Sequence, residues 1–280
     1  QSHTPHRAPV VDLTRFVDLL DWTVAADRFV RLGDAQDLAA RLRAARPHYT
    51  VQQQDPQARR AGEALGQAAR AMTRVSQALE LLRPAEAMEA SAALPKQIAA
   101  LAQLPALNTL PFRLLADQVV SSYAPLAMDK ATQQQQSAEA LRIEREMVER
   151  YLQWGHYVQA AGLAREWLVT WTLLQAGFGD PLESGARKEV EHNLGAAGKE
   201  REHNHGRFGS YPLSTGKDLR QLPHAATLLD LYQQLGDVRN DIMHAGKRPQ
   251  PIPAATLAEK VQRLCARLRE FPLPSEGDAA

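Results

Sequence analysis

Three side chains near the C-terminal end of the sequence are of types that together can act on a phosphodiester bond. The stretch "GDVRNDIMHAGKR", residues 236–248, brings Arg239, Asn240 and His244 close together in the chain. A neutral imidazole can take the proton from a ribose 2′-hydroxyl or supply one to a leaving 5′-oxygen. A guanidinium offers planar, permanently charged donors to a phosphate whose negative charge grows in the transition state. Because RNA carries its own nucleophile, this set could cleave RNA without a metal ion, with Asn240 orienting the imidazole or the phosphate.

The element that must position these groups is a helix predicted over residues 225–245. Its core stripe follows a spacing of three or four and consists of Leu228, Leu231, Leu235, Val238 and Ile242. A polar row with the same spacing on another side consists of Asp237, Asn240, Asp241 and His244, and Arg239 flanks it. Side chains four residues apart are neighbours on a helix surface, so we expect Asn240 and His244 to lie together.

An arginine and a histidine four to six residues apart form a weak motif, because three other pairs in the chain share the spacing. These pairs are Arg43–His48, Arg150–His156 and Arg187–His192. The 239–244 pair differs in context: it has an Asn after the Arg, an apolar stripe opposite, and Lys247 and Arg248 after it. The two basic residues either hold flanking phosphates or only decorate a turn. The competing interpretation of the motif is a set of solvated charges with a histidine favoured by the helix dipole.

The string "RNDIMH" resembles the Arg-(Asn/Asp/His)-x-x-x-His motif of HEPN ribonucleases. The resemblance implies that Arg239 and His244 are the catalytic pair and that Asn240 is the polar residue following the arginine. It also implies a helical bundle that forms a homodimer through the motif helix, so that two motifs face each other in one cleft. Such proteins cleave single-stranded RNA without a metal or cofactor and leave a 2′,3′-cyclic phosphate.

Two longer segments are similar to type III CRISPR-associated proteins that join a CARF sensor domain to a C-terminal HEPN nuclease. They are "PVVDLTRFVDLLDWTVAADRFVRLGDAQDLAARL" and "YLQWGHYVQAAGLAREWLVTWTLLQ". In those proteins, cyclic oligoadenylate bound to CARF switches on the nuclease, which acts as an ancillary defence effector. A CARF domain is a Rossmann-like α/β unit, and no alternation of strands and helices is visible here. The resemblance therefore implies the helical and HEPN portion alone, with cyclic oligoadenylate acting only through a missing CARF domain.

Helical spacing of apolar residues runs from about Asp12 to Glu270, and strand-like runs are scarce, so the predicted fold class is all-α. We expect an N-terminal helical region over residues 10–128 and a HEPN-like helical domain over residues 129–272. Residues 178–223 are predicted to be an irregular insertion, because glycines, prolines, charges and histidines interrupt the pattern. In the N-terminal region, one apolar face of a first helix is predicted from Phe16, Val17, Leu20, Val24, Phe29 and Val30.

Composition narrows the classes of partner. The chain has 280 residues, of which 44% are hydrophobic, and a net charge of +1, so it can build a core but has no overall cationic field. No run of eighteen apolar residues and no leader sequence is visible, so we expect a cytoplasmic protein with no membrane partner. In the His-rich segment 192–211, His203 and His205 have only His192 as an obvious third ligand, so no metal site is predicted. A catalytically silent helical module that dimerises or binds a protein is the competing function.

Overall fold

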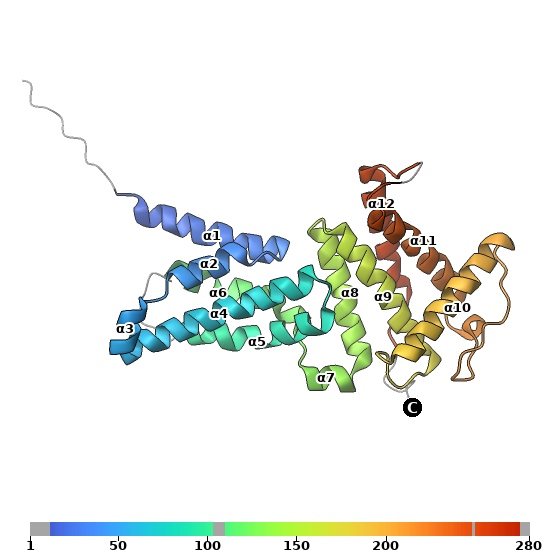
Figure 1. The fold of residues 1–280 in the computed structure, drawn as a ribbon, viewed down its shortest axis with the longest axis horizontal. Coiled ribbons are helices and arrows are strands. Elements are labelled where there is room, and N and C mark those ends of the chain that lie inside the picture. Colours follow the sequence, from blue (N-terminus) through green and yellow to red (C-terminus); the bar gives the residue numbers. More distant parts are fainter. Residues whose placement is uncertain (1–11, 103–109, 248–249, 275–280) are drawn as a thin grey trace, which may run out of the picture. The chain divides into compact units, whose positions relative to one another are not determined.

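The computed structural model describes residues 12–102, 110–247 and 250–274 (Figure 1). The all-α prediction is confirmed: the described residues form helices and contain no strand, apart from one isolated bridge between Pro212 and Asp218. The helices are α1 (Thr14–Leu32), α2 (Gln36–Ala44), α3 (Tyr49–Gln54), α4 (Pro56–Glu80), α5 (Pro84–Ala102), α6 (Leu110–Tyr123), α7 (Lys130–Gln135), α8 (Ser137–Gln153), α9 (Tyr157–Ala176), α10 (Ser184–His203), α11 (Ala225–Met243) and α12 (Ala254–Ala266), with 3₁₀ turns η1 (Ala124–Leu126), η2 (Leu219–Gln221) and η3 (Arg267–Glu270).

The chain divides into two compact units. Unit 1 comprises residues 1–77 and 93–124, and unit 2 comprises residues 78–92 and 125–280. The divisions fall inside α4 and α5, so the turn that joins these two helices belongs to unit 2. These units are defined by packing and not by independent folding, and the predicted domains 10–128 and 129–272 stay a prediction.

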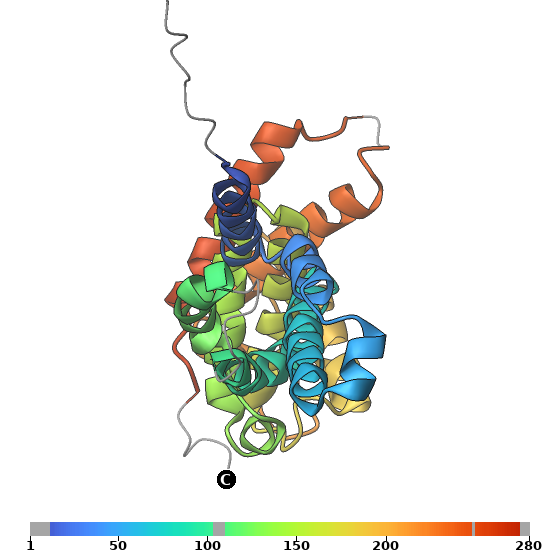
Figure 2. The same cartoon turned by 90° about the vertical axis from the view of Figure 1, so that its left-hand side faces the viewer.

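In the core of unit 1, α1 packs against α2 and α6 (Figure 2), and α4 and α5 contribute further buried residues. The Phe29 and Tyr123 rings stack with centroids 4.5 Å apart, and the Tyr123 hydroxyl donates to the Phe29 carbonyl at 2.5 Å. The α1 helix ends at Gly33, whose left-handed φ of 72° lets its N–H bond back to the same carbonyl. The predicted apolar face of this helix is wrong in part: Phe29 is buried, whereas Phe16 is exposed on the opposite side.

Unit 2 is organised around α9, which packs against α8, α10, α11 and α12. Twelve of its twenty residues are buried, as expected of a helix at the centre of a bundle. Two buried tryptophans on α9 donate to backbone carbonyls: Trp167 Nε1 to Leu141 at 2.7 Å and Trp171 Nε1 to Pro272 at 2.7 Å. These bonds satisfy the indole N–H groups inside the core and hold the segment after α12 against α9.

The predicted irregular insertion over residues 178–223 is wrong for its first half, where α10 forms a twenty-residue helix. Its small and charged residues hide the helical period, but Ala186, Val190, Leu194 and Ala197 recur on one face and are buried. Gly198 lies where an added Cβ would be 3.3 Å from a glutamine side chain of α11. Small residues thus serve close packing of α10 against α11, and only the chain after His203 is irregular.

Candidate functional site

The α11 helix presents the motif because its opposite face is held in the core of unit 2. It packs against α9, α10 and α12, and the buried residues of the predicted stripe are Leu228, Leu231, Leu235 and Val238. Ile242, the last of the predicted stripe, is half-buried. Because these residues face inward, the outer arc of the last two turns faces solvent, and Arg239, Asn240 and Met243 are exposed there.

A tight turn ends α11 at Met243, two residues earlier than predicted. The Ala245 N–H bonds to the Ile242 carbonyl at 2.9 Å, and the Gly246 N–H bonds to the Asp241 carbonyl at 3.3 Å. This is the Schellman arrangement, with Ala245 in the left-handed position at φ 50° that glycine usually takes. His244 is the C-cap, so its side chain projects from the turn at the helix end.

Asp241 was expected in the polar row but is buried, with 3% of its surface exposed, because its position on α11 turns toward the core. Arg248 lies outside the described residues, whereas Lys247 is described and exposed. The described polar surface is therefore made of Arg239, Asn240, His244 and Lys247, in addition to Asp237.

The motif pair differs from the three other Arg/His pairs in its contacts within the chain. The side chains of Arg239, Asn240 and His244 are exposed and make no hydrogen bond or ion pair with another described residue. The arginines of the other three pairs each contact another side chain of the chain. Arg43 donates to Thr73 Oγ1 at 3.0 Å, Arg187 pairs with Glu166 at 2.8 Å, and the Arg150 guanidinium lies 5.8 Å from the Trp154 ring centre.

A second polar cluster in unit 2 joins α8, α9, α10 and α11. Glu166 bridges Arg165 at 3.0 Å and Arg187 at 2.8 Å, and Arg165 also bonds to the Tyr232 hydroxyl and lies 4.6 Å from that ring's centre. Burial raises the pKa of Glu144 to about 7, opposed by the charge of Arg187. The arginines are satisfied inside the protein, so the cluster joins the four helices. No short-range pattern could reveal it, because its members are far apart in sequence.

The irregular stretch after α10 contains His205, and His203 is the last residue of that helix. Across the described ranges, no group of three or more His, Cys, Asp or Glu residues could hold a metal ion. The loop after α10 is tied to that helix through Glu200, which accepts from the Gly209 N–H at 3.0 Å and from the Tyr211 hydroxyl at 2.8 Å. The Tyr211 hydroxyl is therefore held by a carboxylate of the same chain.

Within the described ranges, no helix has both the length and the apolar composition needed to cross a lipid bilayer.

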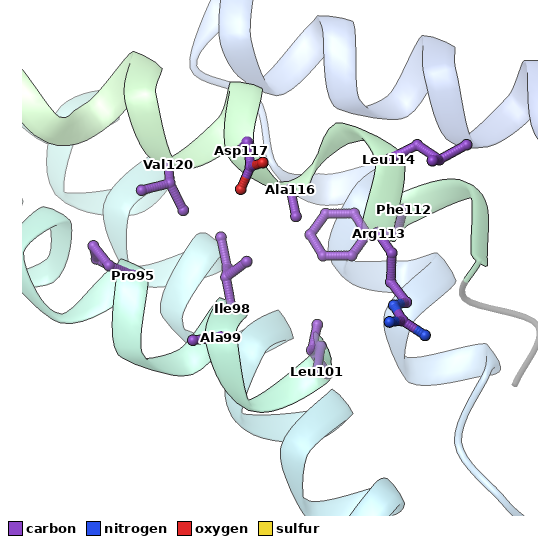
Figure 3. Close-up of a pocket in the computed structure, with 10 residues that line it drawn as sticks. All are labelled: Pro95, Ile98, Ala99, Leu101, Phe112, Arg113, Leu114, Ala116, Asp117 and Val120. Atoms are coloured by element: carbon purple, nitrogen blue, oxygen red, sulfur yellow. The ribbon is translucent and has the colours of Figure 1, made fainter. Parts of the chain in front are cut away.

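Unit 1 contains a cavity of about 540 Å³ between α5 and α6 (Figure 3). Apolar side chains of the two helices face each other across it, including Ile98 and Phe112. Its charged lining residues are Arg113 and Asp117. It contains none of the residues predicted to act on RNA.

One family model matches the chain: CRISPR-associated protein MJ1674, second domain, over residues 18–124. The match supports a CRISPR-associated helical protein. It ends at the last residue of unit 1 and does not reach the motif on α11. A search of curated proteins found no match.

Proposed function

We propose that the chain is a metal-independent endoribonuclease that cleaves single-stranded RNA with Arg239, Asn240 and His244. The observation that carries the proposal is the exposure of these three side chains, without partners among the described residues, at the end of a helix whose other face is buried. The similarity of unit 1 to a CRISPR-associated domain supports an ancillary role in CRISPR defence.

In this mechanism the ribose 2′-oxygen attacks the adjacent phosphorus while the bond from phosphorus to the 5′-oxygen breaks. The neutral imidazole of His244 accepts the 2′-hydroxyl proton, and a second protonated imidazole gives a proton to the leaving oxygen. Arg239 donates to the non-bridging phosphate oxygens as charge grows on them, and Asn240 positions the imidazole or the phosphate. The products are a 2′,3′-cyclic phosphate and a 5′-hydroxyl.

The second imidazole comes from a second copy of the chain, which pairs its motif helix with the first. Exposed Met243, with 65% of its surface accessible, supplies apolar surface beside Arg239 for that contact. Lys247, together with Arg248, would hold phosphates that flank the cut. Cyclic oligoadenylate would act on this chain only through a CARF domain.

A second candidate is a catalytically silent module that dimerises or binds a protein. The observation that favours it is a row of exposed apolar side chains on α1, which has no role in RNA chemistry. This surface and the motif belong to different units, so the two functions can be tested separately.

The test is cleavage of end-labelled single-stranded RNA in excess chelator by wild-type protein, Arg239→Ala and His244→Ala. We expect losses of about 10²–10³-fold for the arginine and about 10²–10⁴-fold for the histidine. Arg43→Ala and His48→Ala are matched controls, because this exposed pair has the same spacing in unit 1. Equal rates for the motif variants and the controls, or intact RNA at every concentration of wild-type protein, would refute the proposal.

A further inference from the structure

The α1 helix is apolar on two opposite faces, and only one of them is covered. Trp22, Ala25, Ala26 and Phe29 are buried against α2 and α6. The opposite face exposes five large apolar residues, each with between 50% and 59% of its surface accessible. These residues, called here the α1 stripe, are Leu13, Phe16, Val17, Leu20 and Val24. Their spacing of three and four places them in one continuous row.

The first two turns of α1 have little support from the rest of the chain. Among the described side chains of residues 12–21, none is buried, and the first buried residue of the helix is Trp22. Short helical segments are marginal in water and gain most of their stability from packing of an apolar face. Four of the five stripe residues lie on this unsupported end, so a partner that covered them would stabilise the segment as well as remove apolar surface from water.

Most of the described charges beside the α1 stripe are paired within unit 1, whereas the exposed Asp12 bonds only to Thr14 among the described residues. Arg31 pairs with Asp27 at 2.7 Å, and Arg28 pairs with Asp34 and Asp37 at 2.5 and 2.6 Å. Asp21, on the same side of the helix as Arg28, pairs with an arginine of α2 at 2.7 Å. The surface is therefore close to electroneutral, which disfavours RNA or a charged peptide as its occupant and favours a second apolar helix.

We infer that the α1 stripe binds the α1 stripe of a second copy of this chain. Two antiparallel copies related by a two-fold axis present the same row to each other, so each apolar residue meets an apolar residue. Five half-exposed side chains offer roughly 500 Å² per copy, and pairing buries roughly 1,000 Å² in total, the lower limit for a specific interface. Among the described residues, most charges beside the row are paired within the chain, so self-association brings few like charges together.

This contact does not depend on RNA cleavage, because it uses unit 1 alone. If α11 also pairs, the α1 contact holds two copies together and raises the effective concentration of one motif helix for the other.

The test measures self-association by sedimentation velocity for the full chain, Leu20→Glu and Leu182→Glu. The second variant is the control, because Leu182 is also an exposed leucine but lies outside α1. We expect a concentration-dependent dimer that Leu20→Glu weakens at least about thirtyfold, since pairing would bury an unpaired carboxylate, and that the control leaves unchanged. Circular dichroism establishes that both variants keep their helices.

Disulfide cross-linking distinguishes a dimer that forms through α1 from a dimer that forms through another surface. The natural Cys265 is buried, so a cysteine placed at residue 20 is the reactive thiol on the surface. Under oxidation, Leu20→Cys should form disulfide-linked dimers and Leu182→Cys should not. A wild-type protein that stays monomeric up to high concentration, or a dimer that neither depends on Leu20 nor cross-links there, overturns the inference. Neither readout uses RNA, so cleavage can fail while this inference stands.

Discussion

The left-handed turn at Ala245, which presents His244, predicts both the direction and the size of a change in the free energy of unfolding. Ala245 has a φ of 50°, a backbone region that costs a residue with a Cβ about 1 kcal/mol and costs glycine almost nothing. Ala245→Gly should therefore raise the free energy of unfolding of unit 2, although the same substitution inside a helix lowers it. For a unit of this size the gain corresponds to a rise of about 2–4 °C in Tm.

The assay is urea and thermal unfolding of the full chain, with Ala196→Gly as the matched control in α10. Ala196 is half-buried inside a regular helix, so its replacement should destabilise by about 0.5–1 kcal/mol. Because glycine preserves the turn, Ala245→Gly should also leave the cleavage rate close to that of the wild type. A loss of stability in Ala245→Gly similar to that of the control would refute the left-handed turn and the placement of His244 that follows from it.

Three further predictions concern unit 2. Gly236→Ala should stabilise by about 0.5–1 kcal/mol in urea titrations, because an added Cβ meets nothing within 4 Å. Because the pKa of Glu144 is raised to about 7, ionisation of this carboxyl destabilises the folded protein as pH rises above the ordinary pKa of a glutamate. Glu144→Gln should therefore stabilise by up to about 3 kcal/mol at pH 8 and far less at pH 4. Equal effects at both pH values would contradict this. Phe271→Ala should destabilise by about 3–5 kcal/mol and alter tryptophan fluorescence, because the ring lies 5.0 Å from the Trp171 ring; an unchanged unfolding curve contradicts its place in the core.

Local sequence patterns were sufficient for most of the helices but not for their contacts. The apolar spacing along α11 predicts its buried face, since a regular helix repeats that spacing at a constant angle. The same reasoning failed for α10, where alanines and glycines replace larger apolar residues because α11 approaches closely. It also assigned Phe16 and Phe29 to one face of α1, although they lie on opposite sides of the helix.

For the candidate site as well, sequence patterns predicted some features and missed others. The residue types at 239, 240 and 244 suggested the chemistry, and periodicity placed the first two on the outer side of a helix. Periodicity could not predict that Asp241 is buried or that α11 ends at Met243, because these depend on neighbouring helices and on a left-handed turn at Ala245. The Glu144 cluster involves four helices, and no local pattern contains that information.

The similarity to a CRISPR-associated domain and the nuclease motif come from different parts of the chain. The family match covers residues 18–124, and the motif begins more than a hundred residues later. Neither observation therefore supports the other by position. The nuclease proposal depends on the chemistry of α11 alone, and chemical analysis of the products can test it without reference to unit 1.

The most direct measurement compares an RNA oligonucleotide with a copy that carries a single 2′-deoxyribose at the cut, both treated in excess chelator. The mechanism predicts that the all-ribose strand yields a 2′,3′-cyclic phosphate and a 5′-hydroxyl, and that the 2′-deoxy strand is left intact at that bond. Cleavage of the 2′-deoxy strand at the same bond, or products that end in a 3′-hydroxyl, would contradict the role assigned to Arg239 and His244.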